Sequence, residues 1–342
     1  MTKLLSIIST LWLAFFPPLI SPVATEINTA AALSQKLNQK IAAPLILNFN
    51  QAQTLPTLAN IPRYLVYNAD NGKVYAAKDS ATRISPASFT KLMSTQVALD
   101  ISIPDHLLSV SPTSIDKIPT VLGLKLGEQF PFYDLLRAAI ATSANDAAAV
   151  IAENAILPYG LKMNTFVELM NEKSKLLNLR NTSFANPEGY DDDKQYSTLE
   201  DISQLINNVV KNYPKIVMAG ASDREDIILN STHGGYYLTN WNGLLGVYPG
   251  VNGLKIAYTE KAGHSTIVTA TRQNVHVVAL VSGANSIPER DLAAAALLDA
   301  AFLSEHQKPM NLSKRHLQPR YNEWNRLIQQ TKRELQILNA KS

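Results

Sequence analysis

The sequence predicts an α+β domain with an antiparallel sheet that is built from both ends of the folded region. Runs of β-favouring residues open this region at 63–78 and return at 265–272 and 275–283. The residues between these runs follow helical patterns, which is the arrangement expected of an α+β fold. The chain has 342 residues, of which 46% are hydrophobic, and this is enough for one large domain or two small ones.

The first element is a hairpin, because two apolar runs flank Asn71-Gly72, a strong short hairpin signal. A helix is expected to begin near Pro86 and Ser88. The alanine-rich stretch 132–155 predicts two further helices, interrupted at Ser143. Later helices are expected at 199–210 and, after the last two strands, at 291–303.

The first 24 residues have the pattern of an export signal. Lys3 gives a positive start, and the apolar run Leu4 to Phe16 has 13 residues, too few to span a bilayer comfortably. Cleavage is expected near Ala24, and an uncleaved, membrane-anchoring start is the alternative. The protein is therefore expected in the periplasm or elsewhere in the extracytoplasmic cell envelope.

Two flanking segments lie outside the predicted domain, which spans residues 59–303. Residues 25–58 are rich in Ala, Gln, Asn and Thr and predict a linker or a lightly packed N-terminal arm. Residues 304–342 predict a basic amphipathic helix. One hypothesis is that this helix packs on its own domain. The other is that residues 320–339 contact a membrane surface or a partner helix. Along this predicted helix, residues at alternating spacings of four and three form one stripe: Trp324, Ile328, Thr331, Leu335 and Leu338.

Composition narrows the classes of function. The absence of cysteine excludes a thiol nucleophile, disulfides and a lipid-modified cysteine. A net charge of +3 gives no support for a nucleic-acid partner. The six histidines lack metal-binding spacing, and the aspartates at 191–193 lack the alternation of a calcium loop, so they predict solvated loop charge. No metal or other cofactor is expected.

Ser88-Phe89-Thr90-Lys91 has the spacing of a serine nucleophile with a lysine base. Residues three apart share one face of a helix, so the Ser88 hydroxyl and the Lys91 amine are expected to be neighbours. A serine needs a base, and a lysine can serve only when it is neutral. Burial and a second cation both lower a lysine pKa, and Lys255 is the candidate second cation. By itself this short motif is weak, because it occurs often by chance.

Two further sequence features support the interpretation of Ser88 and Lys91 as a nucleophile and its base. Ser143-Ala144-Asn145 places two polar side chains between apolar helices, where leaving them unpaired is costly. The alternative is that Ser143 or Asn145 caps a helix. Lys255 lies in the apolar strand-like run that begins at Gly250. Ser-x-x-Lys, then Ser-x-Asn, then a lysine strand is the order found in penicillin-reactive serine enzymes.

With these motifs, residues 60 to 303 resemble the serine D-alanyl-D-alanine carboxypeptidases, the low-molecular-weight penicillin-binding proteins. The resemblance extends to "NADNGKVYAAKDSATRISPASFTKLMS", "LRNTSFANPEGYDDDKQYSTLEDISQL", "YPGVNGLK" and "GANSIPERD". It implies a β-lactamase/DD-peptidase-like fold with an inserted helical subdomain. It also implies a peptidoglycan stem peptide ending in D-Ala-D-Ala as substrate, and β-lactams as covalent inhibitors.

The resemblance implies a role for each residue that matches the motifs. Ser88 attacks the peptide carbonyl and becomes acylated, and Lys91 takes its proton. Ser143 relays a proton toward the leaving amine, while Asn145 binds the substrate backbone. Lys255 keeps Lys91 neutral and orients Ser143.

Two further positions complete the site that the resemblance implies. The backbone N–H groups of Ser88 and Tyr258 form an oxyanion hole. Arg290 receives the terminal carboxylate of the substrate. Water then releases the shortened peptide.

The third motif departs from the family, whose pattern is Lys-Thr-Gly or Lys-Ser-Gly. Here it is Lys255-Ile256-Ala257, followed by Thr259, and these residues are expected to border the substrate. Ile256 lacks the hydroxyl that helps to bind the carboxylate. The Ala257 methyl is expected on the same side of the strand as Lys255, where it either is tolerated or narrows the slot. His264 stands where an aromatic residue is common and is expected to be an ordinary polar or packing residue.

These departures leave several functions open. An active carboxypeptidase with altered carboxylate recognition is the main hypothesis. The alternatives are a DD-endopeptidase that cuts crosslinks and a weakly active or non-catalytic relative that binds peptidoglycan. A β-lactamase is disfavoured, because no glutamate after the second motif is recognisable as the activator of a deacylating water.

Overall fold

The computed structural model describes residues 22–103 and 105–339. Most of the predicted export signal, residues 1–24, lies outside the described residues. The predicted α+β class is confirmed, because a five-stranded antiparallel sheet has the order β2-β1-β9-β8-β7. The sheet draws its strands from both ends of the domain, as the sequence predicts. They are β1 (Arg63–Asn68), β2 (Val74–Lys78), β7 (Val251–Ala257), β8 (His264–Arg272) and β9 (Val275–Ala284).

The predicted hairpin joins β1 to β2, and β1 also pairs with β9, with Leu65 opposite Leu280. Gly72 in the turn has φ 74°, and a Cβ there would lie 2.0 Å from the Ile46 carbonyl oxygen. Only glycine meets both conditions, because a side chain disfavours positive φ and has no room. The first and last thirds of the chain thus meet in the middle of one sheet.

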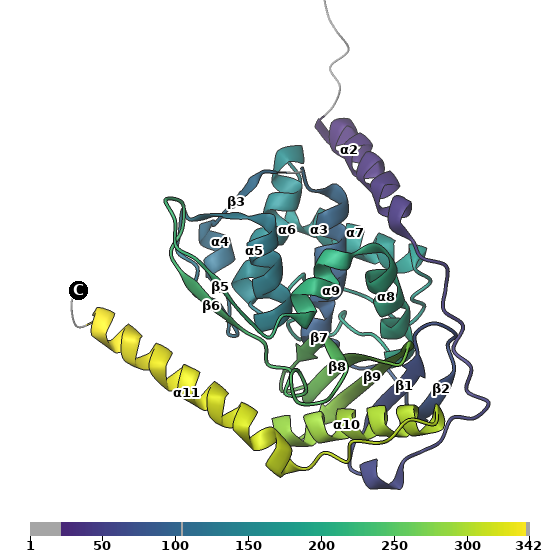
Figure 1. Ribbon diagram of the computed structural model, residues 1–342. Coiled ribbons are helices and arrows are strands. Elements are labelled where there is room, and N and C mark those ends of the chain that lie inside the picture. The colour runs from purple at the N-terminus through teal and green to yellow at the C-terminus, as the bar shows by residue number, and fades with distance from the viewer. Residues whose placement is uncertain (1–21, 104, 340–342) are drawn as a thin grey trace, which may run out of the picture.

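Helices lie on both faces of this sheet (Figure 1). One face is covered by α10 (Ile287–Ser304), which contacts β1, β2, β8 and β9. The other face carries a helical region inserted between β2 and β7. Its helices are α3 (Thr90–Ile101), α4 (Pro112–Ile115), α5 (Phe132–Arg137), α6 (Asn145–Ile156), α7 (Met163–Leu176), α8 (Leu199–Asn212) and α9 (Pro214–Ala221). Two small two-stranded sheets belong to this region, β3 (Leu107–Ser109) with β4 (Gln129–Pro131) and β5 (Arg224–Ile227) with β6 (Tyr236–Thr239).

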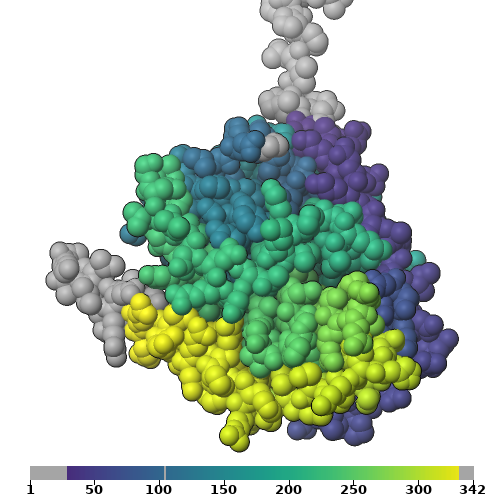
Figure 2. All heavy atoms as spheres, viewed as in Figure 1, coloured from purple at the N-terminus to yellow at the C-terminus, as the bar shows by residue number. Residues whose placement is uncertain are grey.

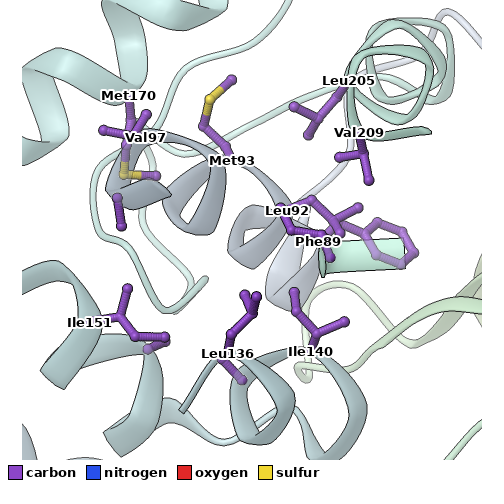
Figure 3. Packing of buried hydrophobic residues seen from close by; sticks show 14 of the residues in the cluster. Phe89, Leu92, Met93, Val97, Leu136, Ile140, Ile151, Met170, Leu205 and Val209 are labelled. Atoms are coloured by element: carbon purple, nitrogen blue, oxygen red, sulfur yellow. The ribbon is translucent and has the colours of Figure 1, made fainter. Parts of the chain in front are cut away.

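Helix α3 lies at the centre of the larger core. Its side chains Leu92, Met93 and Val97 are surrounded by residues of the neighbouring helices, among them Leu136 and Met170 (Figure 3). A second core lies between the sheet and α10. Because α3 is packed on several sides, the serine turn at its start is fixed in place.

The N-terminal segment, predicted to be a linker or a lightly packed arm, contains a helix in its first part. Its first part forms α2 (Pro22–Leu37), which packs on α3 and α7 with Leu33 and Leu37 buried. The buried Lys173 ammonium donates to Asp100 Oδ2 at 2.5 Å and to the Leu37 carbonyl at 3.4 Å. Composition does not reveal this helix, because Leu33 and Leu37 are the buried residues among its described side chains. The rest of the segment, residues 41–58, has little regular structure.

The C-terminal segment forms α11 (Lys314–Asn339), whose side chains are described as far as residue 330. Leu317 and Trp324 are buried, and the Trp324 ring lies edge-on to Trp241 with centroids 5.3 Å apart. The beginning of α11 therefore packs on its own domain, and Figure 2 shows the C-terminal segment along the lower side of the molecule. Over the described residues, no helix has the length and hydropathy that a membrane span requires.

Candidate active site

The candidate nucleophile Ser88 lies in a 3₁₀ turn, Ala87–Phe89, that leads directly into α3. The loop that carries Gly189 presses against this turn. A Cβ on Gly189 would lie 2.0 Å from the Ala87 carbonyl oxygen, and Gly189 has φ 97°. A glycine is needed at this position for the loop to approach the serine so closely.

The Lys91 amine lies beside the serine, as the three-residue spacing predicts. Lys91 is fully buried, and its Nζ lies 2.9 Å from Ser88 Oγ, 2.7 Å from Asn145 Oδ1 and 2.6 Å from the Glu188 carbonyl oxygen. Two of these three partners are carbonyl oxygens, which can only accept. A neutral amine has two N–H groups and one lone pair. The two carbonyls therefore take both N–H groups and leave the lone pair for the Ser88 hydroxyl proton.

Burial lowers the pKa of Lys91 to about 7, against the opposing attraction of the Glu188 and Asp146 carboxylates. The pKa of Lys255 is also well below its ordinary value, because of burial first and then the charges of Lys91 and Arg290. The charge of Lys91 disfavours a second buried ammonium at Lys255, and burial of Lys91 itself favours its neutral form. A neutral Lys91 is thus accessible at physiological pH.

Ser143 and Asn145 lie where a π-helical turn, Ala138–Thr142, meets α6. Ser143 has φ 67°, and both side chains are buried. Neither Ser143 nor Asn145 is the N-cap of α6, because Ala144 occupies that position and no side chain caps the helix; Ser143 is the C-cap of the π-helical turn. Asn145 instead accepts from Lys91 and donates through Nδ2 to the Ile118 carbonyl oxygen at 2.8 Å. It connects the base to the loop before β4.

The third motif lies on the edge strand β7. Lys255 is buried, and its Nζ donates to the Ile256 carbonyl oxygen at 2.9 Å. Ala257 is 0% exposed and belongs to the larger core, so its methyl is packed rather than placed in an open slot. Ile256 is partly exposed, and it is the residue of the motif that meets solvent.

Three other predicted residues occupy surroundings that sequence reasoning did not foresee. Arg290 is only 2% exposed, and its guanidinium binds the Asp291 carboxylate and the Trp241 carbonyl oxygen. Thr259 donates to Asp191 Oδ1 at 2.9 Å. The exposed Tyr258 ring stacks on His264 with centroids 4.4 Å apart, which is the packing role expected of His264.

Several residues at the site were not singled out as site residues in the sequence. Glu188 is buried beside Lys91, and its carboxylate lies 2.9 Å from Lys117 Nζ. Asp191 is exposed, as expected of loop charge, and it also accepts from both Ser85 and Thr259 and thereby links the nucleophile segment to the loop after β7. The available signal was the resemblance of "NPEGYDDD" to a family segment. Over the described residues, no cluster of acidic or histidine side chains is arranged to hold a metal ion.

Comparison with known proteins gives the family. The model of peptidase family S11, described as D-alanyl-D-alanine carboxypeptidase, matches residues 51–286. The chain belongs to this family. The match contains all three motifs, from Ser88 to Lys255.

The S11 relatives include the D-alanyl-D-alanine carboxypeptidase DacF of Bacillus subtilis, 31% identical over 246 residues, which are 70% of this chain and 62% of DacF. DacA of Escherichia coli K12, also named a D-alanyl-D-alanine carboxypeptidase, is 27% identical over 264 residues, 73% of this chain and 63% of DacA. The chain thus spans less than two thirds of each relative. The crystal structure of the Streptomyces K15 DD-transpeptidase superposes with a TM-score of 0.65 and 23% identity, covering 73% of this chain and 100% of that one. This likeness supports the fold.

Proposed function

We propose that the chain is a serine D-alanyl-D-alanine carboxypeptidase that processes peptidoglycan through an acyl-enzyme on Ser88. The observation that carries the proposal is the surroundings of Lys91. A buried amine with two carbonyl acceptors and a serine hydroxyl as its three partners is suited to accept the serine proton. Membership of the S11 family supports D-Ala-D-Ala as the peptide end on which this chemistry acts.

The proposed reaction begins when Ser88 Oγ attacks the carbonyl carbon of the penultimate D-alanine and its proton passes to Lys91. The backbone N–H groups of Ser88 and Tyr258 stabilise the resulting oxyanion. The peptide bond breaks when the leaving D-alanine nitrogen receives a proton through Ser143. Water then attacks the ester, returns the proton to Ser88 and releases the shortened peptide.

Substrate recognition is proposed to combine Asn145, Thr259 and the edge of β7 from Lys255 to Ala257. Arg290, which the resemblance gives as the ligand of the terminal carboxylate, is buried against Asp291, and we propose instead that its charge acts chiefly on Lys255. The hydroxyl that Ile256 lacks would have been the more direct ligand of the substrate carboxylate. Reduced peptide turnover with a fully reactive serine is therefore the expected behaviour.

Export to the periplasm or the extracytoplasmic face of the envelope follows from the proposed substrate and the sequence of residues 1–24. The end of α11, with the basic residues of 320–339, is proposed to contact the membrane surface peripherally. Cleavage of crosslinks by the same site, a DD-endopeptidase activity, is the alternative reaction. It is separated from carboxypeptidase activity by comparing a crosslinked muropeptide dimer with a pentapeptide monomer.

The deciding experiment is intact-mass measurement after incubation with benzylpenicillin, with Ser88→Ala as the matched control. The expected result is one penicilloyl adduct on the wild type and none on the variant. D-alanine release from diacetyl-Lys-D-Ala-D-Ala then tests the peptidase activity. A wild type that forms no adduct, or a Ser88→Ala variant that is still labelled, refutes the proposed nucleophile.

A further inference from the structure

An ion pair lies next to the candidate base and takes no part in the proposed reaction steps. Glu188 follows the end of α7 by a loop, and Lys117 lies in the loop after α4. The Lys117 Nζ and Glu188 Oε1 atoms are 2.9 Å apart, with side chains 21% and 4% exposed. Burying a charged group without a partner is costly, and Lys117 supplies the opposite charge beside Glu188.

Both residues of the ion pair are linked to Lys91 by hydrogen bonds that involve their own or neighbouring backbone groups. The Glu188 carbonyl oxygen accepts from Lys91 Nζ at 2.6 Å, so its residue is a direct neighbour of the base. Ile118, next to Lys117, accepts from Asn145 Nδ2 at 2.8 Å and from the Tyr190 hydroxyl at 3.1 Å. Asn145 in turn accepts from Lys91. The ion pair and the base are thus held in one network of short contacts, so movement of either loop also moves a partner of the base.

We propose that the Lys117–Glu188 ion pair sets the protonation of Lys91, with Glu188 holding a proton on the amine and Lys117 weakening that hold. Both are positioning residues, because they act through Lys91. The inference rests on the proposed function, since it needs Lys91 to be the base for Ser88. It deepens that function by identifying a control on the pH range over which the serine reacts.

The other charges around Lys91 are fixed by contacts of their own. Asp146 on α6 accepts from four backbone N–H groups, those of Leu122, Gly123, Leu124 and Ala147. Lys255 on β7 faces Lys91 with like charge, and Arg290 on α10 faces Lys255. Glu188 differs from Asp146, because its carboxylate is paired with a side chain that reaches solvent. Among these charges, the Lys117–Glu188 pair is therefore the one that can most readily change, and such a change alters the electrostatic potential at Lys91.

The sign of each substitution follows from the charges. Glu188→Gln removes an attraction that favours protonated Lys91, so Lys91 becomes neutral at lower pH. Lys117→Gln leaves Glu188 without its counter-charge, so Lys91 keeps its proton to higher pH. The Glu188 charge already acts to raise the pKa of Lys91, and an opposite charge within about 4–6 Å shifts a pKa by about one unit or more. The acid limb of acylation is therefore expected to move down by about one pH unit in Glu188→Gln and up by about one in Lys117→Gln.

The experiment measures the rate of benzylpenicillin acylation between pH 5 and pH 9 by intact mass for the full chain and the two variants. Lys117→Arg is the matched control, because it keeps the positive charge and is expected to keep the wild-type profile. Thermal melts establish that each variant is folded. If Glu188→Gln does not fold, Lys117→Gln against Lys117→Arg still decides the question.

The outcomes separate this inference from the proposed function. A wild type that is not acylated at all refutes the proposed function. A wild type that is acylated, with acid limbs that stay in place or move the same way in both glutamine variants, overturns the inference alone. An unchanged acylation profile with slower loss of the adduct in Glu188→Gln also overturns it, because Glu188 would then act on the deacylating water.

Discussion

The hydroxyl missing from the third motif gives the sharpest prediction. Ile256→Thr is expected to raise kcat/KM for diacetyl-Lys-D-Ala-D-Ala, because Ile256 is the partly exposed residue of the motif. A hydrogen bond to a charged group contributes about 1.5–3 kcal/mol. Each 1.36 kcal/mol corresponds to about tenfold in rate, so the expected gain is about 10- to 100-fold.

Ala257→Gly is expected to behave differently. The Ala257 methyl is 0% exposed and packed in the larger core, so removing it opens little room for the substrate. The change costs about 0.8 kcal/mol for the buried methyl and about 0.5–1 kcal/mol for glycine within a strand. The free energy of unfolding therefore falls by about 1–2 kcal/mol, with kcat/KM changing by less than about threefold.

D-alanine release at fixed pH and urea unfolding measure the two effects separately. Ile256→Val is the matched control, because valine has the shape of threonine without its hydroxyl. A threonine variant no faster than the valine variant would refute the hydrogen-bond argument. A larger gain from Ala257→Gly than from Ile256→Thr would show that the methyl, against its burial in the structure, obstructs the substrate.

Three further predictions concern the base, the buried arginine and the tail. Benzylpenicillin acylation should fall about tenfold per pH unit below about pH 7, because the Lys91 pKa is about 7 and only its neutral form accepts the proton; a rate that is flat from pH 5 to pH 8 contradicts this. Arg290→Leu should lower the free energy of unfolding by about 3–5 kcal/mol, because it leaves the buried Asp291 carboxylate without its counter-charge. A loss below about 1 kcal/mol in urea unfolding would contradict the pairing. Deleting 304–342 should lower Tm because Trp324 is buried, whereas deleting 331–342 should leave Tm within a few degrees and reduce co-sedimentation with anionic vesicles; equal sedimentation of the full chain and the shorter deletion would argue against membrane contact.

The sequence predicts those elements of the fold that depend on short-range residue patterns. The hairpin around Gly72 and the strands at 265–272 and 275–283 follow short-range rules, and the structure confirms them. Helix α2 was not predictable, because its packing depends on Leu33 and Leu37 meeting α3 and α7, which lie far along the chain. Composition averages over such a segment and therefore predicts a linker.

The same limit applies to the site. The spacing of Ser88 and Lys91 predicts their contact, because a single helical turn brings them together. Nothing local places Glu188 beside Lys91 and Lys117, or sets the Arg290 guanidinium against the Trp241 carbonyl oxygen. Pairing of charges across a fold depends on the tertiary structure, so a sequence motif names the charged residues without saying which partner each one meets.

The groups that activate the serine and the groups that recognise the peptide also differ in where they lie. Lys91 and Lys255 are buried, and burial is the cause of the lowered pKa values on which activation depends. Ile256, where the motif loses a donor, is partly exposed and can influence only what docks against β7. A reactive β-lactam brings a strained ring to the serine and depends less on that donor than a peptide does. Acylation by penicillin is therefore expected to stay fast in this chain while peptide turnover is slow, and the ratio of the two rates should fall in Ile256→Thr.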